Sequence, residues 1–148
     1  MWGWVVHCFK NYAVFKGRAS RPEYWWFCFF NLLVGFVVTR EAGDLRVPLG
    51  FFVWANQLIP SLAVTSRRLH DTGHSFGWGI AQLLTSAPII ALSFVNPRGF
   101  KGSPAALALG GVILLTSFVS ICLIVLCCRK GDAGPNRYGD VAPVEPGR

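Results

Sequence analysis

The sequence predicts an all-α membrane protein in which four transmembrane helices follow a short amphipathic interfacial helix and both termini are cytoplasmic. Three observations predict this class. Only 14% of the 148 residues are charged, whereas a soluble domain has about a quarter. Several apolar runs are long enough to cross a bilayer, and the basic residues between them fall mainly on one side. The length suits one domain, so we expect residues 1–148 to form a single multi-pass membrane domain.

Residues 2–15 have the pattern of a helix that lies in the membrane interface. On a helical wheel, His7, Lys10 and Asn11 fall on one side. Such a division into an apolar and a polar face is typical of interfacial helices. The expected apolar side contains Trp2, Val5, Val6, Phe9, Tyr12 and Ala13.

The first span is expected at about residues 22–39. Ser20 can cap its first turn, and Glu23 stands three residues later, as a capping box requires. The aromatic residues 24–26 come next, where an aromatic belt would lie at the membrane surface.

Further spans are expected at about residues 47–66, 76–95 and 105–128, followed by an irregular tail over residues 129–148. Some amides fall inside the first and second predicted spans, and we expect them to form hydrogen bonds between helices rather than a polar pathway or binding site. These amides are Asn31, Asn56 and Gln57.

The polar run Arg67–Ser75 is expected to be a short loop between two spans. Ten basic residues fall on the side of this loop and of the two chain ends, and four fall on the other side. The positive-inside rule then places the loop and both termini in the cytoplasm. The ten are Lys10, Lys16, Arg18, Arg21, Arg67, Arg68, Arg129, Lys130, Arg137 and Arg148, and the four are Arg40, Arg46, Arg98 and Lys101.

Three segments resemble the bacterial inner-membrane family catalogued as domain of unknown function 805. They are residues 17–27 (GRASRPEYWWF), 67–73 (RRLHDTG) and 131–139, which lead through Asn136-Arg137-Tyr138-Gly139. The segments occur in the same order and extend over nearly the whole chain. The resemblance implies a small multi-pass protein of the bacterial cytoplasmic (inner) membrane, and it implies no reaction.

All three segments are expected on the cytoplasmic face, where their charged side chains can meet. The set can form ion pairs that hold loops against helix ends. Alternatively, it can form a pocket for a phosphate-bearing head group or a partner's acidic segment, because the planar guanidinium group binds phosphate through two contacts. The candidate ligand-binding residues are Arg18, Arg21, Glu23, Arg67, Arg68, His70, Asp71, Asn136 and Arg137, with Asp132 and Asp140 nearby in the same segments.

The same face contains weak catalytic candidates, His70 and Asp71, which could act as a general base. No GxSxG nucleophile motif or phosphate-binding glycine loop accompanies them. His70 and His74 stand four residues apart, but Gly73 lies between them and no third ligand is evident, so we expect no metal and no cofactor.

These observations favour a non-enzymatic membrane protein whose cytoplasmic rim binds anionic lipid head groups or a membrane partner. Membrane lipids are the expected partners, together with a second copy of the chain or another membrane protein. The net charge of +7 lies between apolar blocks, so nucleic acid is not expected. The alternatives are a membrane enzyme acting on a lipid phosphate and an oligomeric channel or transporter. The transporter alternative depends on the amides of Asn31, Asn56, Gln57 and Gln82.

Overall fold

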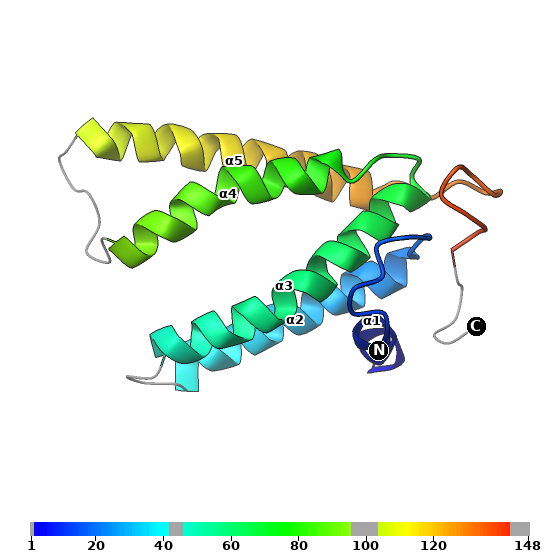
Figure 1. Cartoon of the computed structure of the whole chain (residues 1–148), viewed down its shortest axis with the longest axis horizontal. Coiled ribbons are helices and arrows are strands. Elements are labelled where there is room, and N and C mark those ends of the chain that lie inside the picture. Colours follow the sequence, from blue (N-terminus) through cyan, green and yellow to red (C-terminus); the bar gives the residue numbers. More distant parts are fainter. Residues whose placement is uncertain (1, 42–45, 96–103, 143–148) are drawn as a thin grey trace. The chain divides into compact units, whose positions relative to one another are not determined.

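The computed structural model describes residues 2–41, 46–95 and 104–142. Over this part the chain is all-α, as expected, and its β-type pairing is limited to one bridge between Asn136 and Gly139. The five helices are α1 (Trp2–Lys10), α2 (Arg21–Glu41), α3 (Arg46–Asp71), α4 (Gly77–Val95) and α5 (Pro104–Cys128) (Figure 1).

The chain divides into two compact units. Unit 1 contains residues 1–75 and 129–148, so the tail returns to the helices with which the chain begins. Unit 2 contains residues 76–128, which form α4 and α5.

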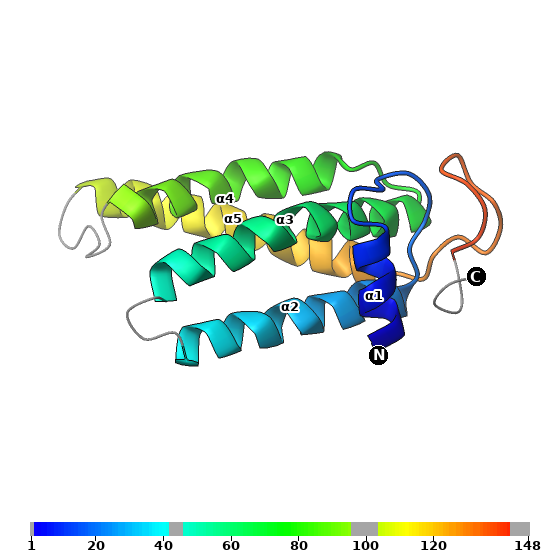
Figure 2. The same cartoon turned by 60° about the horizontal axis from the view of Figure 1, so that its bottom comes forward.

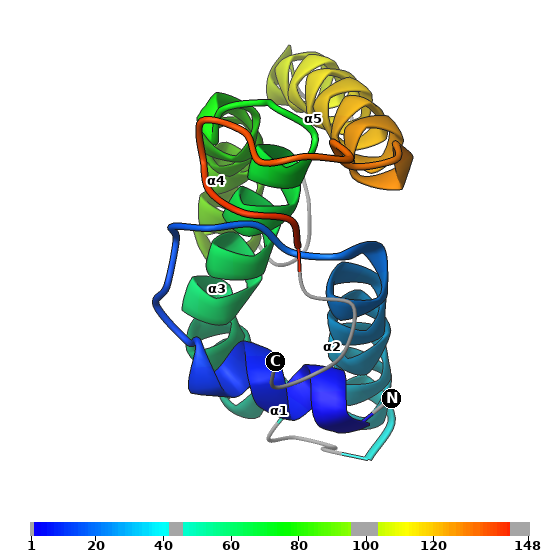
Figure 3. The same cartoon turned by 90° about the vertical axis from the view of Figure 1, so that its right-hand side faces the viewer.

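In unit 1, α2 and α3 form an antiparallel hairpin, and α1 lies across it (Figures 2 and 3). The joint between α1 and the hairpin is apolar. The ring of Phe9 contacts Phe27 edge-on at a centroid distance of 5.6 Å and Phe30 at 5.8 Å. Cys8, Ala19, Phe27 and Val64 are buried together at this joint.

The first helix is shorter than expected, because α1 ends at Lys10 and a turn follows. Its apolar residues also divide into two groups. Trp4, Val5 and Cys8 are buried, whereas Trp2, Val6 and Phe9 are exposed. Part of the apolar surface of α1 therefore packs within the protein and part stays exposed, and its placement in the membrane interface stays a prediction.

In unit 2, polar side chains join α4 and α5. The Thr116 hydroxyl donates to the Thr85 carbonyl oxygen at 2.9 Å, and the Ser120 hydroxyl donates to the Gln82 side-chain oxygen at 3.0 Å. Among the described helices, α5 has a segment, Leu107–Cys128, that is long and apolar enough to cross a membrane, and α4 has a shorter apolar stretch, Gly77–Ala91.

The amides in the middle of the hairpin have different partners. Asn31 on α2 donates to the Ser61 hydroxyl on α3 at 3.2 Å, which is the interhelical hydrogen bond expected of it. Asn56 instead donates to the Phe52 carbonyl of its own helix at 2.8 Å, so the interhelical expectation was wrong for this residue.

Candidate functional site: a buried arginine cluster at the end of α3

The last turn of α3 carries Arg67, Arg68 and Asp71. The expectation of a loop beginning at Arg67 was wrong, because the helix continues to Asp71. It ends in a Schellman motif: the His74 amide donates to the Leu69 carbonyl at 2.9 Å, and the Gly73 amide donates to the His70 carbonyl at 3.1 Å. Gly73 has a φ of 74°, a left-handed conformation that glycine adopts without a steric penalty.

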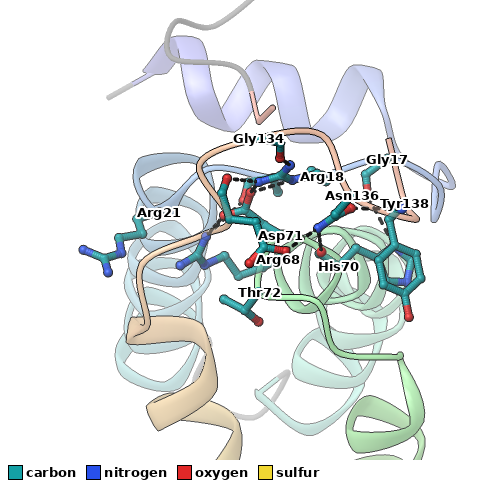
Figure 4. Close-up of polar contacts among 12 residues, drawn as sticks. Gly17, Arg18, Arg21, Arg68, His70, Asp71, Thr72, Gly134, Asn136 and Tyr138 are labelled. Atoms are coloured by element: carbon teal, nitrogen blue, oxygen red, sulfur yellow. Dashed lines mark hydrogen bonds and ion pairs between the residues drawn. The ribbon is translucent and has the colours of Figure 1, made fainter. Parts of the chain in front are cut away.

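Asp71 lies between two arginines from different parts of the chain. The Nε of Arg18 donates to Oδ1 of Asp71 at 2.9 Å, and Nη1 of Arg68, one helical turn before Asp71, donates to Oδ2 (Figure 4). All three side chains are buried, with Arg68 fully inaccessible. Both carboxylate oxygens therefore accept hydrogen bonds from charged groups. We call Arg18, Arg68 and Asp71 the arginine–aspartate cluster.

The C-terminal tail docks onto this cluster through its backbone. The two terminal nitrogens of Arg18 donate to the carbonyl oxygens of Gly134, at 2.6 Å, and Asp132, at 2.5 Å. The Asp132 amide in turn donates to the Asp71 carbonyl at 2.9 Å, and Arg68 donates to the Arg129 carbonyl. Carbonyl oxygens thus complete the coordination of two buried guanidinium groups, as buried charges require.

A second set of contacts holds the tail against His70. The His70 and Tyr138 rings stack in parallel, with their centroids 3.9 Å apart. The Asn136 amide donates to the His70 carbonyl at 3.0 Å and to the Asp132 carboxylate at 2.8 Å. Burial lowers the pKa of His70; the hydrogen bond between its ring and the Gly17 carbonyl acts in the opposite direction, and the charge of Arg137 lowers the pKa further.

A separate buried pair joins α2 to α3 on the side facing α1. Nη1 of Arg67 donates to Oε1 of Glu23 at 2.5 Å, and the Cys8 thiol lies 3.8 Å from the same oxygen. Within the described residues, Nε and Nη2 of Arg67 and Oε2 of Glu23 have no hydrogen-bond partner. Burial, followed by the adjacent Glu23 charge, raises the pKa of the Cys8 thiol to about 12.

The expected capping box of Ser20 and Glu23 was wrong, because Glu23 pairs with Arg67 instead. A capping box needs the Ser20 hydroxyl to accept from the first turn of the helix. Over residues 2–41, 46–95 and 104–142, the Ser20 hydroxyl has no hydrogen-bond partner, and the Glu23 carboxylate accepts from Arg67 and Cys8. A strong ion pair from another helix has taken the carboxylate that local sequence assigned to the cap.

The structure brings together, in unit 1, the three segments whose sequences resemble the family. The buried members of the predicted site are Arg18, Glu23, Arg67, Arg68 and Asp71. Arg21 is exposed and donates to the Arg129 carbonyl at 3.1 Å. Arg137 is also exposed, and its guanidinium group lies over the Tyr138 ring while it donates to the Gly73 carbonyl at 3.0 Å.

The sequence reasoning missed Tyr138, Gly131 and Cys8. A Cβ added at Gly131 would collide with the Asp71 carboxylate, so the tail reaches the cluster because residue 131 has no side chain. The glycine-rich tail was a signal of such a close approach, but it did not indicate which glycine was involved. Cys8 gave no signal, because its neighbour Glu23 lies on another helix.

The geometry restricts the chemistry at the cluster. Both oxygens of Asp71 are engaged by guanidinium groups, and the His70 ring is stacked on Tyr138. In the part of the chain that the structure describes, no group of three or more His, Cys, Asp or Glu residues is placed to hold a metal ion.

Comparison with known proteins assigns the chain to one family. The family model described as "Protein of unknown function (DUF805)" matches residues 12–140, which include the cluster and the docked tail. No solved structure matches the chain.

Three proteins of Escherichia coli K12 are similar to the chain. Inner membrane protein YhaI is 32% identical over 140 residues, covering 93% of this chain and 92% of YhaI. Inner membrane protein YhaH is 31% identical over 154 residues, covering 97% and 98%. Uncharacterized protein YiiR is 28% identical over 130 residues, covering 84% and 83%. The chain is accordingly a bacterial inner-membrane protein, and it belongs to the DUF805 family.

Proposed function

We propose that this chain is a multi-pass protein with α2, α3, α4 and α5 in the bilayer, and that its cytoplasmic rim binds anionic lipid head groups. Apolar exposure along the hairpin supports the placement. Leu32, Phe36 and Phe52 are each more than half exposed, and water would not favour such surfaces. The ten-to-four division of basic residues supports a cytoplasmic rim.

The observation that carries the lipid proposal is a set of exposed basic residues around a buried, self-contained cluster. We call this set the basic rim: Lys10, Lys16, Arg21, Arg129, Lys130 and Arg137.

None of the six rim residues forms an ion pair with a described residue, whereas the buried arginines Arg18, Arg67 and Arg68 all do. Figure 4 shows the Arg21 guanidinium group pointing away from the cluster. The buried arginines therefore hold the segments in place, and the exposed rim residues, whose charges no described carboxylate pairs with, are the ones that can contact phosphate. Each basic residue near an anionic surface contributes about 1 kcal/mol of binding free energy.

The test is lipid retention by the full chain in detergent, measured by native mass spectrometry with added phosphatidylglycerol or phosphatidylcholine. The triple variant Arg21→Gln/Arg129→Gln/Lys130→Gln removes three rim charges without touching a buried pair. We expect it to retain phosphatidylglycerol roughly ten- to hundred-fold more weakly. Arg40→Gln is the matched control, because Arg40 is exposed at the other end of α2. Equal loss in both variants, or equal retention of the two lipids by the wild type, would contradict the proposal.

The bilayer placement has its own test. A reporter fused after residue 148 should be active only in the cytoplasm, and one inserted between α2 and α3 should be active only outside it. A carboxyl-terminal reporter that is active outside the cytoplasm would overturn the orientation.

A further inference from the structure

The exposed apolar side chains of α1 form a face of their own. Trp2, Val6 and Phe9 stand at positions i, i+4 and i+7, so they lie on one side of the helix. They are 65%, 48% and 39% exposed. Cys8, on another side of the same helix, is buried together with Val64 of α3. The helix therefore has one apolar face that the protein covers and a second that stays open.

The two edges of α1 contact α2 at different levels. At one edge, the rings of Trp2 and Phe9 contact the Phe30 ring, with centroid distances of 6.4 and 5.8 Å. At the other edge, Nε2 of His7 lies 3.9 Å from Oε1 of Glu23. Phe30 follows Glu23 by two turns of α2, which is about 10 Å along the helix axis. The open apolar face is therefore directed toward the middle of the hairpin, and a polar side chain is directed toward its charged end.

The direction of α1 suits a membrane surface. It runs across the hairpin rather than along it (Figures 2 and 3), so it lies close to the membrane plane when α2 and α3 cross the bilayer. Helices in this plane bury an apolar face at the boundary between head groups and acyl chains, and tryptophan is enriched at that depth. Lys10 and Lys16 are exposed, and neither forms an ion pair with a described residue, so anionic head groups complement them.

The length of α3 indicates where the boundary lies. Its 26 residues extend over about 39 Å, whereas the hydrocarbon core of a bilayer is about 30 Å thick. From its first residue to Val64, at the joint with α1, the distance is about 27 Å. The part of α3 that follows this joint contains Arg67, Arg68 and Asp71. The helix thus matches the hydrocarbon core up to α1, and its charged last turns exceed it.

We propose that the open apolar face of α1 inserts into the cytoplasmic leaflet of the bilayer, with Trp2, Val6 and Phe9 against the upper part of the lipid acyl chains. The hydrocarbon boundary then runs along α1, and the arginine–aspartate cluster with its docked tail lies on the cytoplasmic side of that boundary. Lipid is the occupant because the face continues through Phe30 to the exposed Leu33, on the surface of α2 that is placed in the bilayer above. The inference rests on that placement, and it assigns a face and a depth to the interfacial helix that the sequence predicts.

The experiment attaches a nitroxide label to single cysteines of the full chain in vesicles of phosphatidylethanolamine and phosphatidylglycerol. Electron paramagnetic resonance compares collisions of the label with oxygen, which concentrates in hydrocarbon, and with a nickel chelate that stays in water. The background replaces the cysteines that are not buried, through Cys28→Ala, Cys122→Ala and Cys128→Ala.

Three label positions are compared. Leu32→Cys, on the exposed surface of α2, is the lipid reference, and Ser75→Cys, exposed just after α3, is the water reference. We expect the oxygen-to-nickel collision ratio at Val6→Cys to be close to the ratio at Leu32→Cys and several-fold higher than at Ser75→Cys. Trp2→Cys, at the most exposed residue of the face, should give the same result, and it keeps the test decisive if Val6→Cys does not fold.

Several outcomes would overturn the inference. A ratio at Val6→Cys that equals the ratio at Ser75→Cys would place the face in water. A label that neither reagent reaches would show that a second copy of the chain covers the face. A ratio at Ser75→Cys as high as at Leu32→Cys would place the end of α3 in hydrocarbon and remove the assigned depth.

The lipid reference separates this inference from the proposed function. A label at Leu32→Cys that collides mainly with the nickel chelate would contradict the placement of α2 in the bilayer itself. If Leu32→Cys collides mainly with oxygen while Val6→Cys collides mainly with nickel, only the insertion of α1 fails and the rim proposal stands.

Discussion

Arg18 and Asp71 are 53 positions apart in the sequence, yet Nη2 of the arginine lies 2.8 Å from Oδ1 of the carboxylate in a buried ion pair. Arg18 precedes α2, and Asp71 is the last residue of α3. The same guanidinium group holds the backbone of the tail at Asp132 and Gly134. One side chain therefore fixes three segments of unit 1 at one point.

The charges at this point are unequal. The arginine–aspartate cluster has two buried guanidinium groups and one buried carboxylate. Asp71 is therefore the one anion in this cluster that lies between the two cations. Removing an arginine leaves a matched pair, whereas removing the carboxylate leaves two cations facing each other. The two kinds of variant should therefore differ in cost.

We predict that Asp71→Asn lowers the free energy of unfolding by about 3–5 kcal/mol, the usual cost of breaking a buried ion pair. Arg18→Met should cost less, because the pair between Arg68 and Asp71 remains and methionine fills part of the volume. Thermal unfolding of the purified protein in detergent measures the order of the two. Asp140→Asn, at an exposed position, is the control and should change stability by less than about 0.5 kcal/mol. A larger loss in Arg18→Met than in Asp71→Asn would contradict this account.

The helices were predictable because hydrophobic runs and turn residues are local signals. The starts and ends of α4 and α5 lie within a residue or two of the predicted runs. The meeting of the three charged segments was also predictable, since the topology expected from the sequence puts them on one face. The end of α3 was not, because Arg67 and Arg68 resemble a solvated loop unless their buried partners are known.

Other parts of the site depend on contacts that leave no local pattern. Glu23 satisfies the spacing of a capping box with Ser20, but a partner 44 residues away holds its carboxylate. The collision that a side chain at position 131 would cause with Asp71 is likewise a tertiary fact. Sequence reasoning identified the charged residues and could not assign their pairs, because pairing is determined by the packing of α1, α2 and α3.

Docking of the tail at Tyr138 should weaken in acid. Because burial holds the pKa of His70 below its usual 6.5, the folded protein binds fewer protons at this site than the unfolded chain does. The stability that neutral His70 contributes is therefore fully present above pH 6.5, and it decreases as the pH falls from 6.5 towards the folded pKa.

The charged groups near His70 are Arg137 and Asp132, and Asp132 is linked to it through the Asn136 side chain. His70→Phe preserves stacking on Tyr138 without a titrating group. We predict that limited proteolysis of the tail speeds up between pH 7.5 and 5.5 in the wild type and is flatter with pH in this variant. An equal acid response in both would mean that His70 is not the group responsible.

The Cys8 thiol should resist alkylation in the folded protein. It is 1% exposed, and burial raises its pKa to about 12, so at pH 8 only about one thiol in ten thousand is ionised. Cys128 is exposed, which makes it the internal reference. We predict that N-ethylmaleimide at pH 8 labels Cys128 and leaves Cys8 unmodified until denaturant is added, as measured by peptide mass spectrometry.

Glu23→Gln tests the electrostatic part of this protection. It removes the negative neighbour that raises the Cys8 pKa and leaves Arg67, which lowers it. Cys8 in this variant should therefore be alkylated faster at pH 8. Unchanged protection in a folded Glu23→Gln protein would mean that exclusion of the reagent alone accounts for it.

Two glycines in the tail provide a matched pair for testing how closely the tail approaches α3. A Cβ at Gly131 would collide with the Asp71 carboxylate, whereas a Cβ at Gly134 would meet nothing within 4 Å. Neither residue has a positive φ, so alanine causes no backbone strain at either position. We predict that Gly131→Ala costs about 1–3 kcal/mol, typical of an overpacked site, and exposes the tail to protease. Gly134→Ala should leave the cleavage rate unchanged, because its added methyl group has room. Equal cleavage rates in the two variants would mean that the tail does not rest on Asp71, and the shared docking of three segments at Arg18 would then need another explanation.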